Sequence, residues 1–258
     1  MKAAVGPGPA EADRRIRALR PAKVAIGARR PLGSQLEPER RPGGRIERAL
    51  TVFLAGAECP FTCSFCDLWR QTLDGPTPPG ALPGQLDLAL EERRHTGPLP
   101  DRIKLYNASN FFDRRAVPPE DHAWLAELAG GAAVTVETHA RLVGPACRRF
   151  ADRLAGQLEV AVGLETVHPA ALAGLNKRMT LDDFDRAAAT LRAADLDLRA
   201  FVLLGVPGIP EAESVEWTIR SVEHAVAAGA AVVSVIPVRD GNGELDRLRA
   251  EGAWRPPT

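Results

Sequence analysis

The sequence is poor in several residue types that mark common protein classes. It has four cysteines and one tyrosine in 258 residues, and aromatic residues make up only 5% of the chain. Three of the cysteines lie within eight residues, so the fourth, Cys147, has at most one partner among them. A disulfide framework is a poor explanation for this distribution in a chain of this size. We therefore expect reduced thiols.

The chain also lacks long apolar segments and an overall charge. No apolar signal-like region follows Met1, and no apolar run approaches membrane-spanning length without an interruption by Gly, Ser or charge. Lys/Arg and Asp/Glu are equal in number at 33 each. The hydrophobic content of 45% is enough for a substantial core. We expect a cytoplasmic protein that does not bind membranes.

The charge is unevenly distributed along the chain. Residues 1–48 carry 12 Lys/Arg and 5 Asp/Glu, a net charge of +7, so residues 49–258 carry −7. The first segment is broken by "GPGP", "RRPLG" and "RRPGG" and is interpreted as a basic, Pro/Gly-rich extension. It either contacts a phosphate backbone or another acidic partner, or is a solvated tail. The lack of aromatic residues before Phe53 favours the tail.

From residue 49 the chain alternates short apolar runs with helical stretches, as repeated βα units do. The runs are too continuous for a half-exposed antiparallel sheet, which favours buried parallel strands. No G-x-G-x-x-G follows any of them, so dinucleotide binding is disfavoured. A doubly wound sheet and a barrel both remain open. The six expected strands are "LTVFLAG", "RIKLYN", "AVTVET", "LEVAVGLE", "LRAFVLLG" and "AAVVSVIPV".

Helices are expected between these strands, and polar residues cluster just after several strand ends. In a barrel those ends share one face, where functional groups gather. The expected helices cover residues 84–95, 119–128, 144–154, 181–194, 211–228 and 244–250.

The three clustered cysteines, Cys59, Cys63 and Cys66, form a C-x3-C-x2-C pattern in "AECPFTCSFC" after the first of these strands. A structural zinc site needs four ligands, usually as two separated pairs, and no second pair is present. His95 and His122 are the zinc alternatives, but neither has a partner at ligand spacing. Three thiolates suit instead an iron–sulfur cluster with one iron left open.

"CPFTCSFC" resembles the signature of the radical S-adenosylmethionine (SAM) enzymes, including the aromatic Phe65 before the last cysteine. The resemblance covers residues 49–251 and implies a partial (β/α)6 TIM-like barrel of parallel strands. It also implies that the three cysteines hold a [4Fe-4S] cluster whose fourth iron binds SAM. "GLET", "LNKRMTLDDF", "LLGVPG" and "WRPP" resemble the Elp3/MiaB-like branch, and more closely the radical SAM proteins of archaeosine formation.

The resemblance also implies contacts to SAM. Asn107, Ala108 and Ser109 in "KLYNASNFFD" occupy the place of the family's Gly-Gly-Glu motif, whose backbone meets the SAM amino group. The departure from glycine leaves backbone contacts available. Glu137 in "VETHARLV" is the candidate ligand of the SAM ribose, and a salt bridge at the barrel rim is its alternative.

Two further segments continue this resemblance. "GLETVHPAALAGLNKRM" implies that Glu165 lies at a strand end, with Lys177 as the cationic partner of the SAM carboxylate and Arg178 as the alternative. "LLGVPG" resembles a turn that permits close backbone approach. We assign no catalytic residue beyond the cluster ligands.

The implied reaction is reductive cleavage of SAM to methionine and a 5′-deoxyadenosyl radical that abstracts hydrogen from a substrate. A flavodoxin or ferredoxin is the expected electron donor. The resemblance suggests a tRNA nucleoside as substrate, with a tRNA or protein partner. A small metabolite or peptide is the alternative substrate, and a non-catalytic electron-transfer or scaffold protein is the alternative class.

Overall fold

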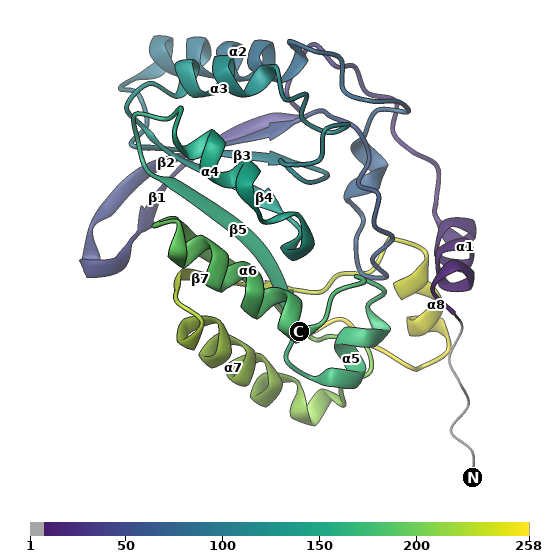
Figure 1. The fold of residues 1–258 in the computed structure, drawn as a ribbon. Helices are drawn as coiled ribbons and strands as arrows, with labels where there is room; N and C mark the ends of the chain where they lie inside the picture. Colours follow the sequence, from purple (N-terminus) through teal and green to yellow (C-terminus); the bar gives the residue numbers. More distant parts are fainter. Residues whose placement is uncertain (1–7, 258) are drawn as a thin grey trace.

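Seven strands form one curved sheet in chain order, and the computed structural model describes them within residues 8–257 (Figure 1). Six of the strands run parallel, and the first pairs antiparallel with the second. The curled sheet is a half-barrel, so the expected partial TIM-like barrel is confirmed. The strands are β1 (Gly33–Arg40), β2 (Ile46–Leu54), β3 (Arg102–Asn107), β4 (Ala133–Thr138), β5 (Leu158–Glu165), β6 (Asp197–Leu204) and β7 (Ala230–Pro237).

Helices cover the outer face of the half-barrel, and Figure 1 shows α2, α3, α4, α6 and α7 along it. None of the helices within residues 8–257 is long and apolar enough to cross a membrane. The α-helices are α1 (Pro9–Leu19), α2 (Ala81–Thr96), α3 (Asp121–Ala129), α4 (Pro145–Ala151), α5 (Pro169–Gly174), α6 (Leu181–Ala193), α7 (Glu211–Ala227) and α8 (Glu244–Ala250). Short 3-10 turns are η1 (Pro42–Gly44), η2 (Leu68–Gln71) and η3 (Ala140–Leu142).

The strands alternate between an apolar outer face and a polar inner face, because successive side chains of a strand point to opposite sides. Ile103 and Leu105 of β3 belong to the main hydrophobic core, whereas Arg102 and Lys104 belong to a buried set of charges. The strands β2 to β6 are buried along most of their length, whereas β7 is only partly buried. The apolar outer face makes these strands recognisable in the sequence even though the inner face carries charges. All six expected strands occur, as β2 to β7, and the six expected helices occur with ends shifted by three residues or fewer.

The N-terminal region differs from the sequence-based expectation. β1 pairs along its whole length with β2, from Gly33 opposite Phe53 to Arg40 opposite Ile46. The expected boundary at residue 48 therefore cuts a hairpin, and residues 33–48 belong to the sheet rather than to an extension outside it. The strand escaped recognition because Glu37 and Glu39 on it are held by cations and not by apolar packing. Residues 1–7 and Thr258 lie outside the described residues.

Buried charges fill the half-barrel at the amino ends of its parallel strands. Arg102 pairs with Glu47 at 2.8 Å, and Arg199 pairs with Glu159 at 2.7 Å. Arg41, from the turn after β1, reaches Glu159 at 2.6 Å. Glu39 pairs with Arg199, so this ionic layer also joins the first strand to the sixth. Buried charges are costly unless they are paired, and these are paired several times over.

Candidate cluster and cofactor site

The loop after β2 carries the three clustered cysteines at the carboxyl end of the half-barrel. Cys59, Cys63 and Cys66 are all partly buried, and each thiol lies within electrostatic reach of at least one of the others. Burial raises the pKa of all three thiols, that of Cys66 to about 12. Metal ligation requires thiolates, so binding at this loop must release protons.

Three asparagine side chains from three separate segments of the chain hold this loop. Asn110, after β3, donates from Nδ2 to the Cys59 sulfur at 3.3 Å. Asn176, after α5, donates to the Thr62 carbonyl at 2.7 Å. Asn242, after β7, donates to the Ser64 carbonyl at 2.8 Å. The loop conformation is therefore determined by residues far apart in the sequence.

Lys177 and Glu165 form a buried ion pair close to the cysteines. The Lys177 ammonium also donates to the Gly163 carbonyl at 2.8 Å. Burial alone would lower the Lys177 pKa, but Glu165, Cys63 and Glu137 together outweigh it, so the pKa is raised and the side chain stays charged. A Cβ on Gly163 would lie 2.1 Å from both charged groups, so a side chain at this position would have to displace the pair. Lys177 is thus near the site, but it already has a carboxylate partner.

His139, after β4, connects the cysteine loop to Lys177. Its ring stacks on Phe61 of the loop with centroids 3.9 Å apart. Nδ1 accepts from the Arg141 main-chain N–H, so Nε2 carries the proton and donates to the Lys177 carbonyl at 2.9 Å. Burial, with help from the Lys177 cation, lowers the His139 pKa to about 4. The imidazole is therefore neutral at physiological pH.

Two cavities open beside the cysteine loop, and Glu137, Tyr106 and Leu68 line both. The first has a volume of about 310 Å³ and is also lined by Phe65, Cys66 and Glu165. Burial raises the Glu137 pKa to about 7 against the lowering effect of the Lys177 charge. Glu137, which the sequence predicted as a site residue, thus lines both cavities.

The second cavity, about 280 Å³, is lined by apolar side chains and by Asn107 and Ala108. Both amide atoms of the Asn107 side chain are buried without a hydrogen-bond partner, and so is the Ser109 hydroxyl. Unpaired buried polar atoms are costly, and their concentration at one site is typical of a binding site. Of the predicted motif, Asn107 and Ala108 thus line the cavity, whereas Ser109 lies beside it without lining it.

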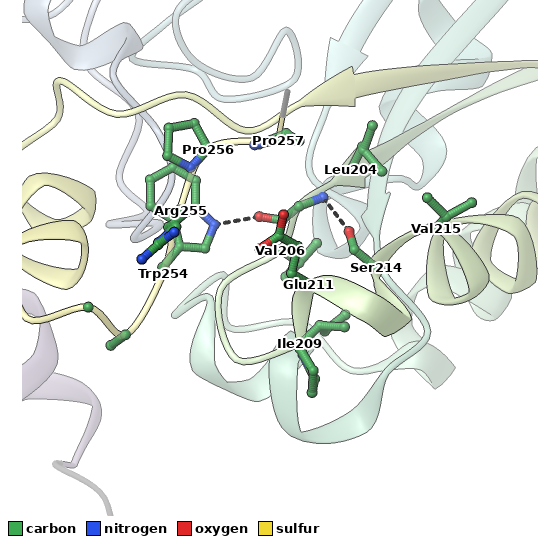
Figure 2. Close-up of a pocket in the computed structure, with 14 residues that line it drawn as sticks. Leu204, Val206, Ile209, Glu211, Ser214, Val215, Trp254, Arg255, Pro256 and Pro257 are labelled. Atoms are coloured by element: carbon green, nitrogen blue, oxygen red, sulfur yellow. Dashed lines mark hydrogen bonds between the residues drawn. The ribbon is translucent and has the colours of Figure 1, made fainter.

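A third cavity, about 410 Å³, lies on the other side of the "GVPG" turn after β6, and Figure 2 shows the residues around it. The Gly205 N–H donates to the Ser214 hydroxyl at 3.0 Å, and the Trp254 indole donates to the Gly205 carbonyl at 2.6 Å (Figure 2). A Cβ on Gly205, whose φ is +78°, would lie 2.7 Å from Pro257. The close backbone approach expected at this glycine is therefore made by the C-terminal segment.

The N-terminal segment 9–24 packs against the cysteine loop and α8 (Figure 1). Arg20 pairs with Glu58 at 2.7 Å, and its guanidinium lies 4.6 Å above the Trp69 ring. Asp13 accepts from Asn176 at 2.8 Å. Sequence analysis did not predict this role for the basic segment, because its contacts join charges that are far apart in the chain.

The zinc alternatives do not lie at this site. His122 packs in an aromatic cluster with Phe111 and Phe150, His95 is exposed near the end of α2, and Cys147 is buried on α4. Within residues 8–257, no group of three His, Cys, Asp or Glu side chains surrounds a single-ion position. A four-iron cluster takes each thiolate on a different iron, so its ligands do not converge on one point. Three cysteines in one loop supply three of the four thiolate ligands that a cubane cluster takes.

Comparison with solved structures identifies the fold class. The radical SAM methyltransferase TsrM from Kitasatospora setae has a TM-score of 0.52 at 15% identity, over 79% of this chain and 38% of that one. A queuine lyase from Clostridium spiroforme, solved with SAM and queuine, has a TM-score of 0.53 at 14% identity, over 85% of this chain and 90% of that one. The chain therefore has the fold of the radical SAM enzymes, and the resemblance inferred from the sequence is confirmed.

A protein of known name also resembles the chain in sequence. The beta subunit of archaeosine synthase from Methanosarcina acetivorans is 27% identical over 222 residues, which is 81% of this chain and 63% of that protein. The chain thus spans less than two thirds of this relative's length. No family model matches the chain.

The half-barrel brings every sequence-predicted site residue to one end. The three cysteines, Glu137, Glu165 and Lys177 follow strands or adjoin strand ends there, and the other predicted residues are Phe65, Asn107, Ala108 and Ser109. Sequence reasoning included Asn110 in the segment that takes the place of the Gly-Gly-Glu motif but gave its side chain no role, and it assigned none to His139, Asn242 or Tyr106. His139, Asn110 and Asn242 are polar residues within five positions after the end of a strand, and this shared position could have identified them.

Proposed function

We propose that this protein is a radical SAM enzyme in which Cys59, Cys63 and Cys66 hold a [4Fe-4S] cluster. The observation that carries the proposal is the three-cysteine loop at the carboxyl end of a half-barrel with the radical SAM fold. When bound, cluster and SAM supply a 5′-deoxyadenosyl radical by one-electron reductive cleavage, with methionine as the other product. A flavodoxin or ferredoxin is the proposed electron source.

The cavity between Phe65 and Glu165 is the proposed SAM site. It adjoins Cys66, so a ligand there reaches the cluster loop, and Glu137 offers a carboxyl group to a ribose. Because Lys177 is neutralised by Glu165, a SAM carboxylate would have to share that ammonium. We therefore propose two roles for Lys177: it pairs with the buried Glu165 carboxylate, and it attracts the SAM carboxylate.

The neighbouring cavity is the proposed substrate site. Its volume of about 280 Å³ admits a moiety of the size of one nucleobase or amino acid. Phe53 and Tyr106 provide flat apolar walls, and Leu32 lies at its edge. The beta subunit of archaeosine synthase supports a tRNA nucleoside as the substrate. A metabolite or peptide of the same size is the alternative.

Anaerobic reconstitution with iron and sulfide tests the cluster. We expect about four irons per chain and reductant-dependent conversion of SAM to 5′-deoxyadenosine. Cys63→Ala should abolish both, whereas Cys147→Ala, which alters a buried cysteine on α4, should preserve both. Stoichiometric zinc in the wild type would contradict the proposal. An intact cluster that does not cleave SAM would favour the electron-transfer or scaffold alternative.

Deuterium transfer tests the substrate. A deuterated candidate nucleoside in tRNA should pass its label into 5′-deoxyadenosine, and the corresponding free metabolite should not. The opposite result would favour the small-molecule alternative. Salt-sensitive binding of bulk tRNA would support an RNA substrate independently, because phosphate contacts weaken as counterion concentration rises.

A further inference from the structure

We propose that Asn110 is a positioning residue of the cluster, whose side-chain amide donates a hydrogen bond to the Cys59 sulfur and makes the cluster easier to reduce. The inference rests on the proposed function, because it concerns the cluster held by the same three cysteines. It goes beyond that function by assigning a role in setting the reduction potential to a residue outside the cysteine motif.

The direction of the amide is fixed by its surroundings. Nδ2 lies 3.3 Å from the Cys59 sulfur, and Oδ1 accepts the main-chain N–H of His139 at 2.8 Å. A main-chain nitrogen can only donate, so the oxygen must face His139 and the NH2 group must face the sulfur. The usual ambiguity between amide oxygen and nitrogen is therefore removed by the backbone.

The residue that carries the amide is rigidly held. Asn110 is only 4% exposed, and its carbonyl accepts from the Asp113 N–H at 3.0 Å. The next residue, Phe111, donates from its backbone to the Glu137 carbonyl at 2.8 Å. The donor is thus fixed before any metal binds, which avoids the cost of ordering it later.

The chemical consequence follows from the charge that reduction adds. A donor to a thiolate ligand withdraws electron density from the sulfur and stabilises the more negative, reduced cluster. Among the side chains of residues 8–257, Asn110 alone donates to one of the three loop sulfurs. The two other asparagines that hold the loop, Asn176 and Asn242, bind main-chain carbonyls instead.

Two matched variants separate the hydrogen bond to sulfur from the holding of the loop. Asn110→Asp keeps an acceptor for His139 but loses the donor to Cys59. Asn242→Asp makes the same chemical change at a residue after β7 that also contacts the cysteine loop, keeping an acceptor for the Leu245 N–H and losing the donor to the Ser64 carbonyl. It controls for an added carboxylate and a lost contact to the loop, but its charge is not placed against a sulfur. Asn110→Leu is a neutral variant that also removes the donor.

The measurement is the midpoint potential of the reconstituted cluster without SAM, followed by electron paramagnetic resonance during a redox titration. We expect Asn110→Asp and Asn110→Leu to shift the midpoint to more negative values, and Asn242→Asp to shift it less than Asn110→Asp. Equal potentials in wild type and both Asn110 variants, or an equal shift in the two Asp variants, would overturn this inference and leave the proposed function intact. A wild type that takes up no iron would overturn both.

Discussion

Gly163 is the residue on which the buried Lys177–Glu165 pair depends, because both charged groups occupy the space that a side chain would fill. We expect Gly163→Ala to displace the pair and to lower the free energy of unfolding by about 1–3 kcal/mol, the usual cost of inserting a methyl group into a packed site. Urea unfolding followed by circular dichroism measures this loss.

Gly174→Ala is the matched control, because a Cβ at that position meets no heavy atom within 4 Å. We expect it to change the free energy of unfolding by less than ~1 kcal/mol. A similar loss in both variants would show that the close approach at Gly163 does not determine stability.

We expect His122, which lies away from the cluster site, to make the stability of the fold depend on pH. Burial, followed by the charges of Arg153 and Arg149, lowers its pKa from 6.5 to about 4, while Glu120 acts in the opposite direction. The unfolded chain therefore binds a proton near pH 6.5 that the folded protein does not bind until about pH 4. Its contribution to stability is complete above pH 6.5 and is lost as the pH falls toward 4.

The test is His122→Phe, which keeps a ring against Phe111. We expect the variant to lose less stability than the wild type between pH 7 and pH 5 in urea unfolding. The difference stays below ~1.4 kcal/mol per pH unit because the ring is partly exposed. An unchanged pH dependence would mean that His122 does not titrate in this range.

Single residues show how far the sequence alone could predict the site. Cys59, Cys63 and Cys66 were recognisable because their spacing is local and is written in eight consecutive residues. The amides of Asn110 and Asn242 were not, because each meets the loop only through the folded chain, with Asn242 lying 178 positions from its partner. Long-range pairing leaves no periodic signal in a single sequence.

At the scale of elements, the segment 9–24 acts as a brace for the cysteine loop. Arg20 and Lys23 both pair with Glu58, next to Cys59, and Asp13 joins α1 to Asn176. Deletion of residues 1–24 should therefore accelerate backbone hydrogen exchange in residues 57–70 of the metal-free protein at least several-fold, because local opening governs exchange.

Deletion of residues 1–7 is the control, since it removes none of these contacts. It should leave exchange in the loop unchanged. Equal exchange in both deletions would show that α1 does not restrain the loop. The same two proteins separate the brace from an RNA-binding arm: loss of tRNA binding with unchanged loop exchange would favour the arm.

The elements also differ in how readily the sequence predicts them. The strands β2 to β7 bury an apolar outer face against helices, so their runs of Val, Leu and Ile are visible in the sequence. β1 pairs partly exposed glutamates with Lys104 and Arg199 and contains Pro38, which together conceal a strand. β1, the strand that the sequence pattern did not predict, is thus held in the sheet by charge pairs with distant residues.

For the whole molecule, the ionic layer makes the half-barrel sensitive to the loss of any one of its buried charges. Glu159 is fully buried and pairs with Arg41 and Arg199. Glu159→Gln leaves both cations with less compensation, and we expect it to lower the free energy of unfolding by about 3 kcal/mol. Urea unfolding at pH 7 measures the loss.

The exposed pair Arg220–Glu216 supplies the control, because Glu216→Gln should change the free energy of unfolding by less than ~0.5 kcal/mol. A Glu159→Gln protein as stable as this control would show that the layer is compensated by solvent or by rearrangement.

The same ionic layer limits the side from which ligands can reach the cavities. Arg102, Glu159 and Arg199 fill one end of the half-barrel, while both cavities beside the cysteine loop lie toward the other. The amino end of the half-barrel is therefore filled by side chains, and the cavities lie at its carboxyl end. SAM and substrate would therefore both enter and leave on the side of the cysteine loop, where exposed side chains such as Phe53 and Leu68 line the cavities.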